Sequence, residues 1–250
     1  MIEVINLNKA FHGKQILFDV SAKFETGQTN LIIGQSGHGK TVLLKSIVGL
    51  HQIDAGQIVY GDKIFSEMSF IQQRSIRKKI GMLFQGSALF DSLSVEENVR
   101  FPLDMFSSMS TEEKMDRVNF CLNRVKLENV NHLYPSEISG GMQKRVAIAR
   151  AIALNPKYLF CDEPNSGLDP KTSIVIDNLI YEITKEYGIT TIINTHDMNS
   201  VMGIGEKIIY IHEGKKLWEG NKEEIFTATE QQLNDFVFAS ELFKRIKDSN

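Results

Sequence analysis

Apolar and polar positions follow two different periods along the chain. Residues Ile2–Leu7 and Ile16–Phe24 alternate apolar and polar side chains, which predicts strands with one buried face. Later runs such as Tyr158–Asp162 are apolar nearly throughout and predict strands buried on both faces. The predicted strands are Ile2–Leu7, Ile16–Phe24, Thr29–Gly34, Gln57–Tyr60, Ile80–Phe84, Tyr158–Asp162, Thr190–Asn194, Ile208–His212 and Lys215–Glu219.

Helical periodicity appears between these strands. The predicted helices are Thr41–Gly49, Ile71–Lys79, a helix that Thr111 begins as N-cap, Met142–Leu154 and Lys171–Tyr187. Because helices alternate with strands, the pattern predicts an α/β fold with a mainly parallel sheet core. The opening and closing hairpins add an antiparallel β subdomain, and the segment between Gly86 and Pro135 reads as a helical insertion.

The chain of 250 residues is long enough for one large α/β domain with a small appended part. We expect a core with its β subdomain over residues 1–85 and 136–220, a helical subdomain over 86–135 and a C-terminal helical extension over 221–250. In that extension, several apolar residues share one helical face, which suits packing on the chain's own sheet or contact with a second copy. These residues are Leu233, Phe236, Val237, Phe243 and Ile246.

Composition narrows the class of protein. The chain is 42% hydrophobic and 24% charged with a net charge of −3, so it does not attract polyanions as a basic nucleic-acid binder would. Two cysteines, Cys121 and Cys161, are too few for a disulfide framework and predict reduced thiols in the core. No segment has the ~20 apolar residues that cross a bilayer. If the protein works at a membrane, another protein must anchor it.

A glycine-rich segment fits the phosphate-binding pattern G-x-x-x-x-G-K-[ST] between an apolar strand and a helix. Its glycines let backbone N–H groups close around phosphate oxygens, and the helix dipole adds positive potential. Lys40 is predicted to reach the β- and γ-phosphates, and the Thr41 hydroxyl to bind Mg²⁺. Alone, the loop indicates only a nucleoside triphosphate. It consists of Gly34, Gln35, Ser36, Gly37, His38, Gly39, Lys40 and Thr41.

Two carboxylates follow the buried strand Tyr158–Asp162, where ligands bind in such sheets. Asp162 is predicted to organise Mg²⁺, and Glu163 to polarise the attacking water. The alternative is an acidic strand end that caps a turn, which the phosphate loop makes less favoured. His196 ends another apolar strand, where its imidazole could donate to the γ-phosphate.

A second glycine cluster, Ser139-Gly140-Gly141, opens a helix and offers another anion-binding N-terminus. With it, the sequence resembles the ABC ATPase family along nearly the whole chain. Ser139–Gly141 is similar to the family's signature motif, and Gln85 to its Q-loop glutamine. Ser166–Asp169 resembles the D-loop, His196 the switch histidine, and Phe11 the aromatic residue that stacks on adenine.

The resemblance implies an ATPase that binds ATP and Mg²⁺, with Gln85 added to the metal ligands Thr41 and Asp162. It also implies a head-to-tail dimer of two copies, in which the phosphate loop of one and the signature of the other enclose each ATP. The sequence departs from the common pattern at Phe11, His38 and Asn165, and at Ile138 and Met142 around the signature. No departure removes a residue assigned to phosphate, metal or water.

The segment from Gly81 to Leu103 is similar to ATPases of phospholipid transporters that work with MCE-domain proteins, also called the organic-solvent-tolerance type. We therefore expect lipid transport with a separate membrane permease and an MCE-domain partner, on the cytoplasmic face of the inner membrane. The first alternative is an importer of amino acids such as methionine, whose ATPases share much of this segment. The second is a soluble ABC ATPase acting on nucleic acid or ribosomes, although nucleic acid is not an expected partner.

The predicted permease site lies near Gln85–Phe90. Leu89 and Phe90 suit either the core of the helical insertion or a groove for a permease helix, with Phe90 nearer the groove. The basic stretch Arg74–Lys79 suits a solvated helix face, or more weakly a contact with anionic lipid heads.

Overall fold

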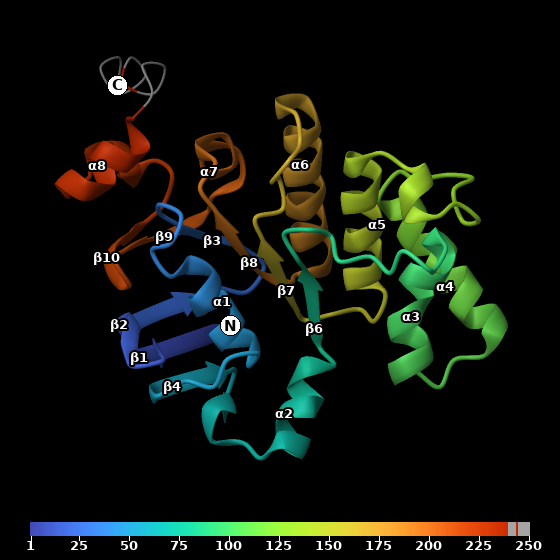
Figure 1. The fold of residues 1–250 in the computed structure, drawn as a ribbon, viewed down its shortest axis with the longest axis horizontal. Helices are drawn as coiled ribbons and strands as arrows, with labels where there is room; N and C mark the ends of the chain where they lie inside the picture. Colours follow the sequence, from blue (N-terminus) through green and yellow to red (C-terminus); the bar gives the residue numbers. More distant parts are fainter. Residues whose placement is uncertain (240–243, 245–250) are drawn as a thin grey trace.

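The computed structural model describes residues 1–239 and residue 244, and it confirms the predicted α/β class (Figure 1). A six-stranded sheet forms the centre, and its strands are parallel except for the edge strand β10. In spatial order its strands are β10 (Lys215–Gly220), β9 (Lys207–His212), β3 (Thr29–Ile33), β8 (Thr190–Thr195), β7 (Tyr158–Asp162) and β6 (Ile80–Leu83).

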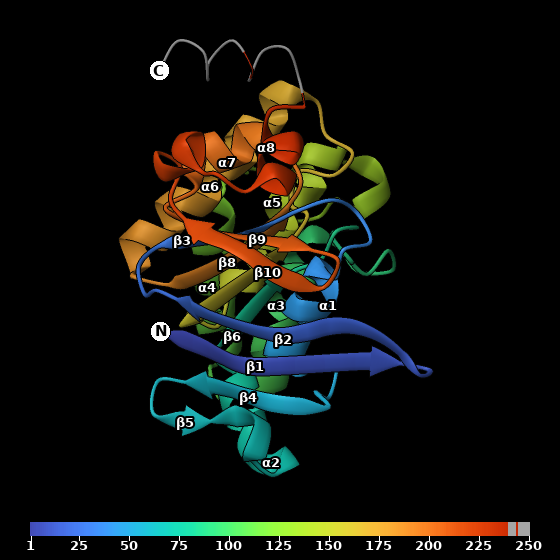
Figure 2. The same ribbon diagram turned by 90° about the vertical axis from the view of Figure 1, so that its left-hand side faces the viewer.

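A four-stranded antiparallel sheet lies beside the first, as Figure 2 shows for β1, β2 and β4. The predicted opening hairpin is therefore confirmed. The strand predicted at Gln57–Tyr60 begins two residues earlier: β4 starts at Ala55, because Ala55 pairs with Asn8 of β1. The strand order is β2 (Lys14–Phe24), β1 (Ile2–Phe11), β4 (Ala55–Tyr60) and β5 (Lys63–Ile64).

The period of two in the central strands divides the apolar side chains between two cores. In β3, Leu31 and Ile33 join one core, whereas Ile32 joins the other. Helix α1 (Lys40–Val48) packs in the core that the two sheets share. On the opposite face, α5 (Gly140–Ile152), α6 (Pro170–Tyr187) and α7 (Met198–Ile204) cover the parallel sheet. Both faces are covered, as a buried parallel sheet requires.

Helices α2 (Phe70–Arg77), α3 (Val95–Phe106) and α4 (Thr111–Arg124) each begin at a serine with a capping box. The N-cap predicted at Thr111 is wrong by one residue. Ser110 caps α4 instead, because its Oγ accepts a hydrogen bond from the Glu113 N–H and the Glu113 carboxylate accepts one from the Ser110 N–H. Helices α3 and α4 pack on α5 through the shared core, and the proposed subdomain boundaries stay a prediction.

The basic stretch at the end of α2 is mostly solvent-exposed, as expected of a solvated helix face. Arg74, Lys78 and Lys79 are exposed, whereas Arg77 is half-buried and donates from Nη2 to the Gly49 carbonyl at 2.8 Å.

The last described helix, α8 (Gln231–Val237), packs on the chain's own core. Leu233 and Val237 are buried, and the Phe236 ring stacks on Tyr210 with a centroid distance of 5.6 Å. This packing supports the first of the two expectations for the C-terminal face. Phe243 and Ile246, which belong to the same expectation, lie outside the described residues.

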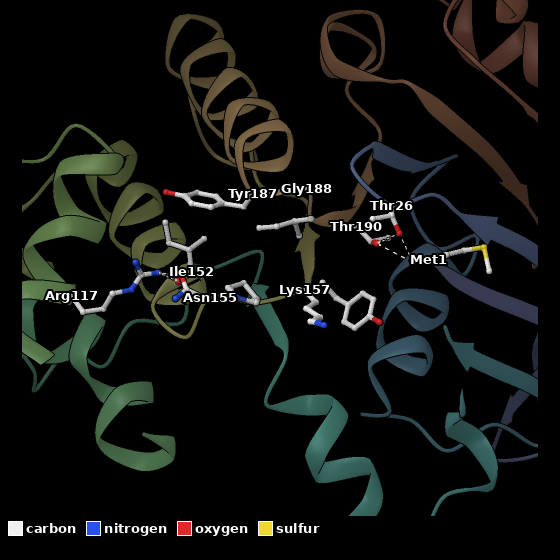
Figure 3. A pocket seen from close by; sticks show the side chains of 12 residues that line it. Met1, Thr26, Arg117, Ile152, Asn155, Lys157, Tyr187, Gly188 and Thr190 are labelled. Carbon is white, nitrogen blue, oxygen red and sulfur yellow. Dashed lines mark hydrogen bonds between the residues drawn. The ribbon is translucent and has the colours of Figure 1, made fainter. Parts of the chain in front are cut away.

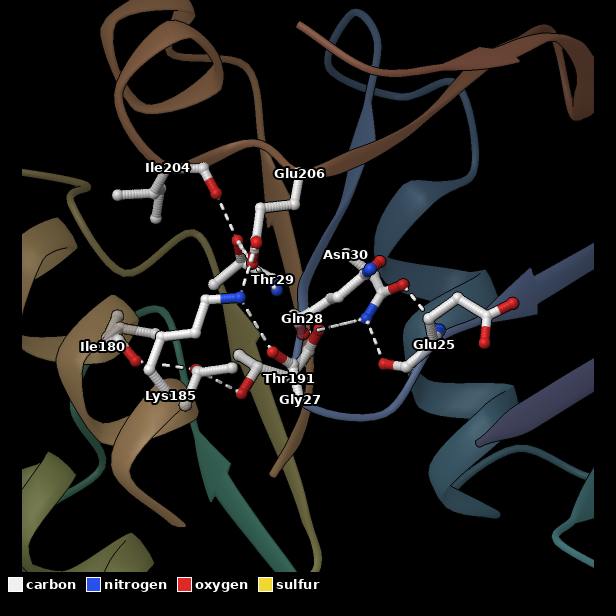
Figure 4. A network of polar contacts seen from close by, with 11 residues as sticks. Glu25, Gly27, Gln28, Thr29, Asn30, Ile180, Lys185, Thr191, Ile204 and Glu206 are labelled. Atoms are coloured by element: carbon white, nitrogen blue, oxygen red, sulfur yellow. Dashed lines mark hydrogen bonds and ion pairs between the residues drawn. The ribbon is translucent and has the colours of Figure 1, made fainter. Parts of the chain in front are cut away.

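A polar network closes the end of the sheet away from the phosphate loop (Figure 4). Asn30 on β3 donates to the carbonyl of Thr191 on β8 at 3.0 Å. Glu206, just before β9, accepts from the Thr29 N–H at 3.0 Å and from Lys185 of α6 at 2.5 Å. These bonds fix the starts of three strands relative to α6, so the opposite ends converge in a defined arrangement.

Cys121 and Cys161 are buried free thiols, as predicted, and burial raises the pKa of Cys121 to about 11. Within residues 1–239 and 244, no helix combines the length and apolar character needed to cross a membrane.

Candidate nucleotide site

The phosphate loop connects β3 to α1 at the carboxyl edge of the parallel sheet. Gly39 has φ of +101°, and a Cβ there would lie 2.8 Å from Leu17 Cδ2, so the turn requires glycine. Gln35, Ser36 and Gly37 are exposed at the rim, whereas Lys40 is buried with its Nζ 2.9 Å from the Gln35 carbonyl.

The charge of Lys40 is balanced by its neighbours. Burial lowers the pKa of Lys40, and the nearby carboxylates of Glu163 and Asp162 oppose that change. A partly desolvated ammonium at the inner wall of a glycine-rich loop is suited to a polyanion, which would replace the carbonyl as its partner.

Two of the three predicted metal ligands, Thr41 and Asp162, lie together although they come from separate elements. Thr41 Oγ1, at the start of α1, donates to Asp162 Oδ1, at the end of β7, over 3.1 Å. Asn194 of β8 donates to both: its Nδ2 is 2.7 Å from Asp162 Oδ1 and 2.9 Å from Thr41 Oγ1. Sequence reasoning missed Asn194, although a lone amide in the apolar run of β8 was a usable signal.

Glu163 leaves the line of β7 because its φ of 46° lies in the left-handed region. Its N–H donates to the Asn194 carbonyl at 2.9 Å, which supports this conformation. Glu163 Oε2 accepts from Gln85 Nε2 at 2.8 Å, and Oε1 lies 3.2 Å from His196 Nδ1. The structure thus brings together the predicted water-polarising carboxylate, the Q-loop glutamine and the switch histidine.

Lys144 of α5 supports the backbone at Gln85, because its Nζ donates a hydrogen bond to the Gln85 carbonyl. The residue is buried, and burial lowers the pKa of its ammonium while the nearby Cys161 thiol and Asp162 carboxylate raise it. The sequence offered no signal for this role, because a lysine within an amphipathic helix resembles a solvated one.

The second predicted anion-binding site, Ser139-Gly140-Gly141, lies apart from the phosphate loop. Ser139 is the N-cap of α5, where its Oγ accepts from the Met142 N–H at 3.3 Å. A Cβ on Gly141 would lie 2.7 Å from Thr172 Cγ2, so this turn packs closely on α6. In the described part of the chain, no hydrogen bond joins residues 139–141 to the phosphate loop, and α1 and α5 cover opposite faces of the sheet (Figure 1). Gly140 lies in the same helix start, away from the phosphate loop.

Phe11, the predicted adenine-stacking residue, is half-buried at the end of β1 and packs edge-on against His51 at 5.1 Å. The described contacts do not link it to the phosphate loop, so stacking stays a prediction. His38 in the loop packs edge-on against His212 at 4.8 Å. Burial and the neighbouring His212 lower the pKa of His38, which favours a neutral ring beside the loop.

The segment after Gln85 is held in a shape that presents Phe90 to solvent. Arg150 donates to the Ser87 and Ala88 carbonyls at 2.8 Å each. Asn98 accepts from the Phe90 N–H at 2.9 Å and donates to the Phe90 carbonyl at 3.1 Å. Phe90 is 43% exposed, whereas Leu89 packs on the core. Leu89 therefore agrees with a place in the core, and the exposure of Phe90 agrees with a surface that could receive a permease helix.

The described surface has a hollow beside the candidate nucleotide site and another away from it. One borders Glu163, Ser166 and His196 and continues along α6 toward Phe236. The other lies at the opposite end of the strands, where Arg117, Lys157 and Thr190 line it (Figure 3). Arg117 already donates to the Ile152 and Ala153 carbonyls that end α5, so its charge there has a structural use.

Comparison with known proteins identifies a family along most of this fold. Residues 17–166 match the family model described as ABC transporter. The methionine import ATP-binding protein MetN of Clostridium acetobutylicum is 38% identical over 241 residues, which cover 96% of this chain and 75% of that protein. The protein of that name from Clostridioides difficile is 39% identical over 237 residues, covering 95% and 74%.

Solved structures agree in fold. The ATP-binding cassette MJ0796, a dimer in a post-hydrolysis state bound to ADP and Pi, is 33% identical with a TM-score of 0.81 and covers 89% of this chain and 99% of its own. The structure of cbiO1 from Clostridium perfringens, part of the ABC transporter complex cbiONQ, is 30% identical with a TM-score of 0.84, covering 99% and 97%.

These relatives correct the expected transport substrate. The assignment to phospholipid transporters is contradicted, because the similar proteins are named for methionine import. The MCE-domain partner rested on that assignment and has no support. The physical reason is that residues of this segment such as Leu83, Val95 and Val99 are buried in the ATPase core, and such packing contacts do not depend on the transported substrate. The amino-acid alternative is the one these relatives favour.

Proposed function

The chain belongs to the ABC transporter family and is an ATPase, and we propose that it powers an importer of amino acids, with methionine as the first candidate. The similarity to methionine import proteins along 96% of the chain supports the substrate. The observation that carries the ATPase mechanism is the convergence of Thr41, Asp162, Glu163 and His196 at one edge of the sheet. Substrate would be bound by other subunits.

Mg²⁺ is proposed to bind at Thr41 and Asp162, with Gln85 as a third ligand. Hydroxyl, carboxylate and amide oxygens are the hard donors that suit this ion, which otherwise keeps waters and substrate phosphate oxygens. Among the described residues, no group of three or more His, Cys, Asp or Glu side chains could hold a metal alone. The donor set therefore fits an ion that arrives with ATP, and when bound it would neutralise charge on the phosphates.

Glu163 is proposed to orient and polarise the attacking water. Its two carboxylate oxygens already contact Gln85 and His196, so a water and a γ-phosphate would enter a prearranged set of polar groups. Lys40 would exchange the Gln35 carbonyl for the β- and γ-phosphates. His196, half exposed, would donate to the γ-phosphate.

Two copies are proposed to close around ATP head to tail. In one copy the helix start at Ser139 lies apart from the phosphate loop, and its N–H groups would find a γ-phosphate only on a neighbour. The dimeric cassette bound to ADP and Pi supports this arrangement. Hydrolysis would remove the γ-phosphate contact and weaken the closed dimer.

A membrane permease is proposed to dock beside Gln85–Phe90, which would hold the chain peripherally at the cytoplasmic face of the membrane. The exposed Phe90 ring, 4.8 Å from the ring of Phe101, supports this surface. The relationship to a subunit of a transporter complex supports a partner of this class.

Uptake of radiolabelled methionine tests the substrate. Cells that lack the chain should lose most uptake, the parent chain should restore it, and Glu163→Gln should not. Uptake of a sugar serves as the control. If deletion leaves uptake of methionine and other amino acids unchanged while the purified chain hydrolyses ATP, the importer assignment is wrong and the ATPase assignment remains.

A further inference from the structure

Asn194 is a fully buried amide in the central strand β8 of the parallel sheet. In the strand order β3-β8-β7, it lies between the strand that leads into the phosphate loop and the strand that ends in Asp162. Its register partners are Ile32 on β3 and Asp162 on β7. A side chain at this position can reach both halves of the nucleotide site.

The amide makes its two bonds to two of the three proposed Mg²⁺ ligands, Thr41 and Asp162. Nδ2 donates to Asp162 Oδ1 at 2.7 Å and to Thr41 Oγ1 at 2.9 Å, and Thr41 Oγ1 donates to the same carboxylate oxygen at 3.1 Å. The orientation of the amide is fixed chemically, because a carboxylate oxygen only accepts hydrogen bonds. The three side chains therefore form a closed triangle from three separate elements.

Two side-chain oxygens of this triangle, Asp162 Oδ2 and Asn194 Oδ1, remain available for further contacts. Asp162 Oδ1 is occupied by two donors, whereas none of the described hydrogen bonds involves Oδ2. The Asn194 Oδ1 atom is buried without a partner, which is costly unless a donor arrives. A water molecule held by a cation is a donor of that kind.

We propose that Asn194 is a positioning residue that holds Thr41 and Asp162 in one arrangement and so prepares the Mg²⁺ site before nucleotide enters. The inference rests on the proposed Mg²⁺ site at these two residues. Without the amide, Asp162 and Thr41 would still be present, but each could turn separately. The part of ATP affinity that depends on Mg²⁺ should weaken, whereas metal-free ATP binding by the phosphate loop should not.

Calorimetric titration of the full chain with ATP, once in EDTA and once in excess Mg²⁺, measures this difference. Asn194→Leu keeps a similar volume and removes both bonds. It should reduce the tightening by Mg²⁺ about tenfold and leave the Kd in EDTA within twofold of the parent, because loss of a group that orients a metal ligand typically costs ~10–100-fold in metal affinity.

The matched control is Thr191→Val, a buried polar residue on the same strand whose hydroxyl bonds to Thr184 at 2.6 Å. It should leave the Mg²⁺ effect unchanged even if it lowers the melting temperature. Asn194→Ala provides the same measurement should the leucine variant fail to fold. Parent-like tightening by Mg²⁺ in the Asn194 variants overturns the inference.

Asp162→Asn distinguishes the inference from its premise. If Asp162→Asn abolishes the Mg²⁺ effect and the Asn194 variants keep it, the metal site stands and the positioning role is wrong. If Asp162→Asn also keeps it, the proposed metal site itself is wrong.

Discussion

At the scale of single residues, neighbours in the sequence have different surroundings. Asp162 remains on its strand and turns toward Thr41, whereas Glu163 adopts a left-handed backbone and turns toward Gln85 and His196. The change in backbone conformation between the two separates their contacts. One carboxylate is thus available to a metal and the other to a water.

Asp177 of α6 is a buried carboxyl outside this pair. Burial raises its pKa to about 6, although hydrogen bonds from Ser200 at the start of α7 and from Asn165 lower it, the latter donating at 2.8 Å. The nearby Asp197 carboxylate acts in the same direction as burial. Through Asn165, which also donates to Ser200, the carboxyl connects the loop after Glu163 to the helix after His196.

The raised pKa of Asp177 predicts a loss of stability with rising pH. An acid whose pKa is higher in the folded state binds its proton more tightly there, so the native state is favoured below the ordinary value of 3.8 and loses that advantage as pH rises to about 6. Asp177→Asn should remove a contribution of about 2–3 kcal/mol to this dependence. Urea unfolding of parent and variant at pH 4.5 and 7.5 measures the difference.

Other titrating groups cancel in that comparison because both proteins contain them. The free energy of unfolding of the variant, relative to the parent, should be higher at pH 7.5 than at pH 4.5. Parallel pH profiles for the two proteins would contradict the assignment of the raised pKa to Asp177.

At the scale of elements, helices α3 and α5 fix a loop that neither contains. Asn98 of α3 and Arg150 of α5 together bond the backbone at Ser87, Ala88 and Phe90. The Phe90 ring is therefore presented by bonded backbone instead of by a free loop, and it lies beside the exposed ring of Phe101.

Phe90→Asp should release the permease while leaving the chain folded and active. The ring is already 43% exposed, so its removal costs the soluble chain little, whereas a charge would be buried in the proposed complex. Co-purification from detergent-solubilised membranes measures the association.

Phe120→Asp on α4 is the matched control, since its ring is 46% exposed and lies on another helix. It should retain the permease. Equal retention by both variants excludes Phe90 from the docking surface.

At the scale of the whole molecule, each copy contributes two separate parts to the proposed ATP sites of a dimer. Its phosphate loop would bind one ATP, and its Ser139 helix start would contact the ATP bound to the other copy. The phosphate loop and the Ser139 helix start occupy separate positions, so in the proposed head-to-tail arrangement ATP would join two copies only when both halves are intact.

Glu163→Gln should bind ATP, slow its hydrolysis at least ~10²-fold and accumulate as a dimer, because the γ-phosphate that joins the copies persists. Light scattering with Mg²⁺ and ATP should give twice the 28.3 kDa mass of one chain. Phosphate release measures turnover. Glu223→Gln, an exposed glutamate beyond β10, should behave like the parent.

The double variant Glu163→Gln/Ser139→Arg separates the clasp from other modes of association. A bulky side chain at Ser139 should prevent the dimer while ATP still binds to the phosphate loop. An equally stable dimer in the double variant would show that the Ser139 helix does not take part.

The sequence determined the local elements and the family. Period-two runs predicted the buried strands, Ser139-Gly140-Gly141 predicted the start of α5, and the motif from Gly34 to Thr41 predicted the phosphate loop. These features depend on neighbours within a few residues, so the sequence alone predicts them. The prediction of lipid transport was wrong, because the segment behind it packs in the ATPase core and does not specify a substrate, whereas the similar proteins are named for methionine import.

Only the tertiary structure decided which distant residues meet. The strand order places β8 between β3 and β7, and this order makes Asn194 a neighbour of both Thr41 and Asp162. The contacts of Lys144 with Gln85 and of Asp177 with Asn165 also depend on the tertiary structure. Such contacts depend on which strands pair and which helix covers them, and that choice is made by burial across the whole sheet instead of by local pattern.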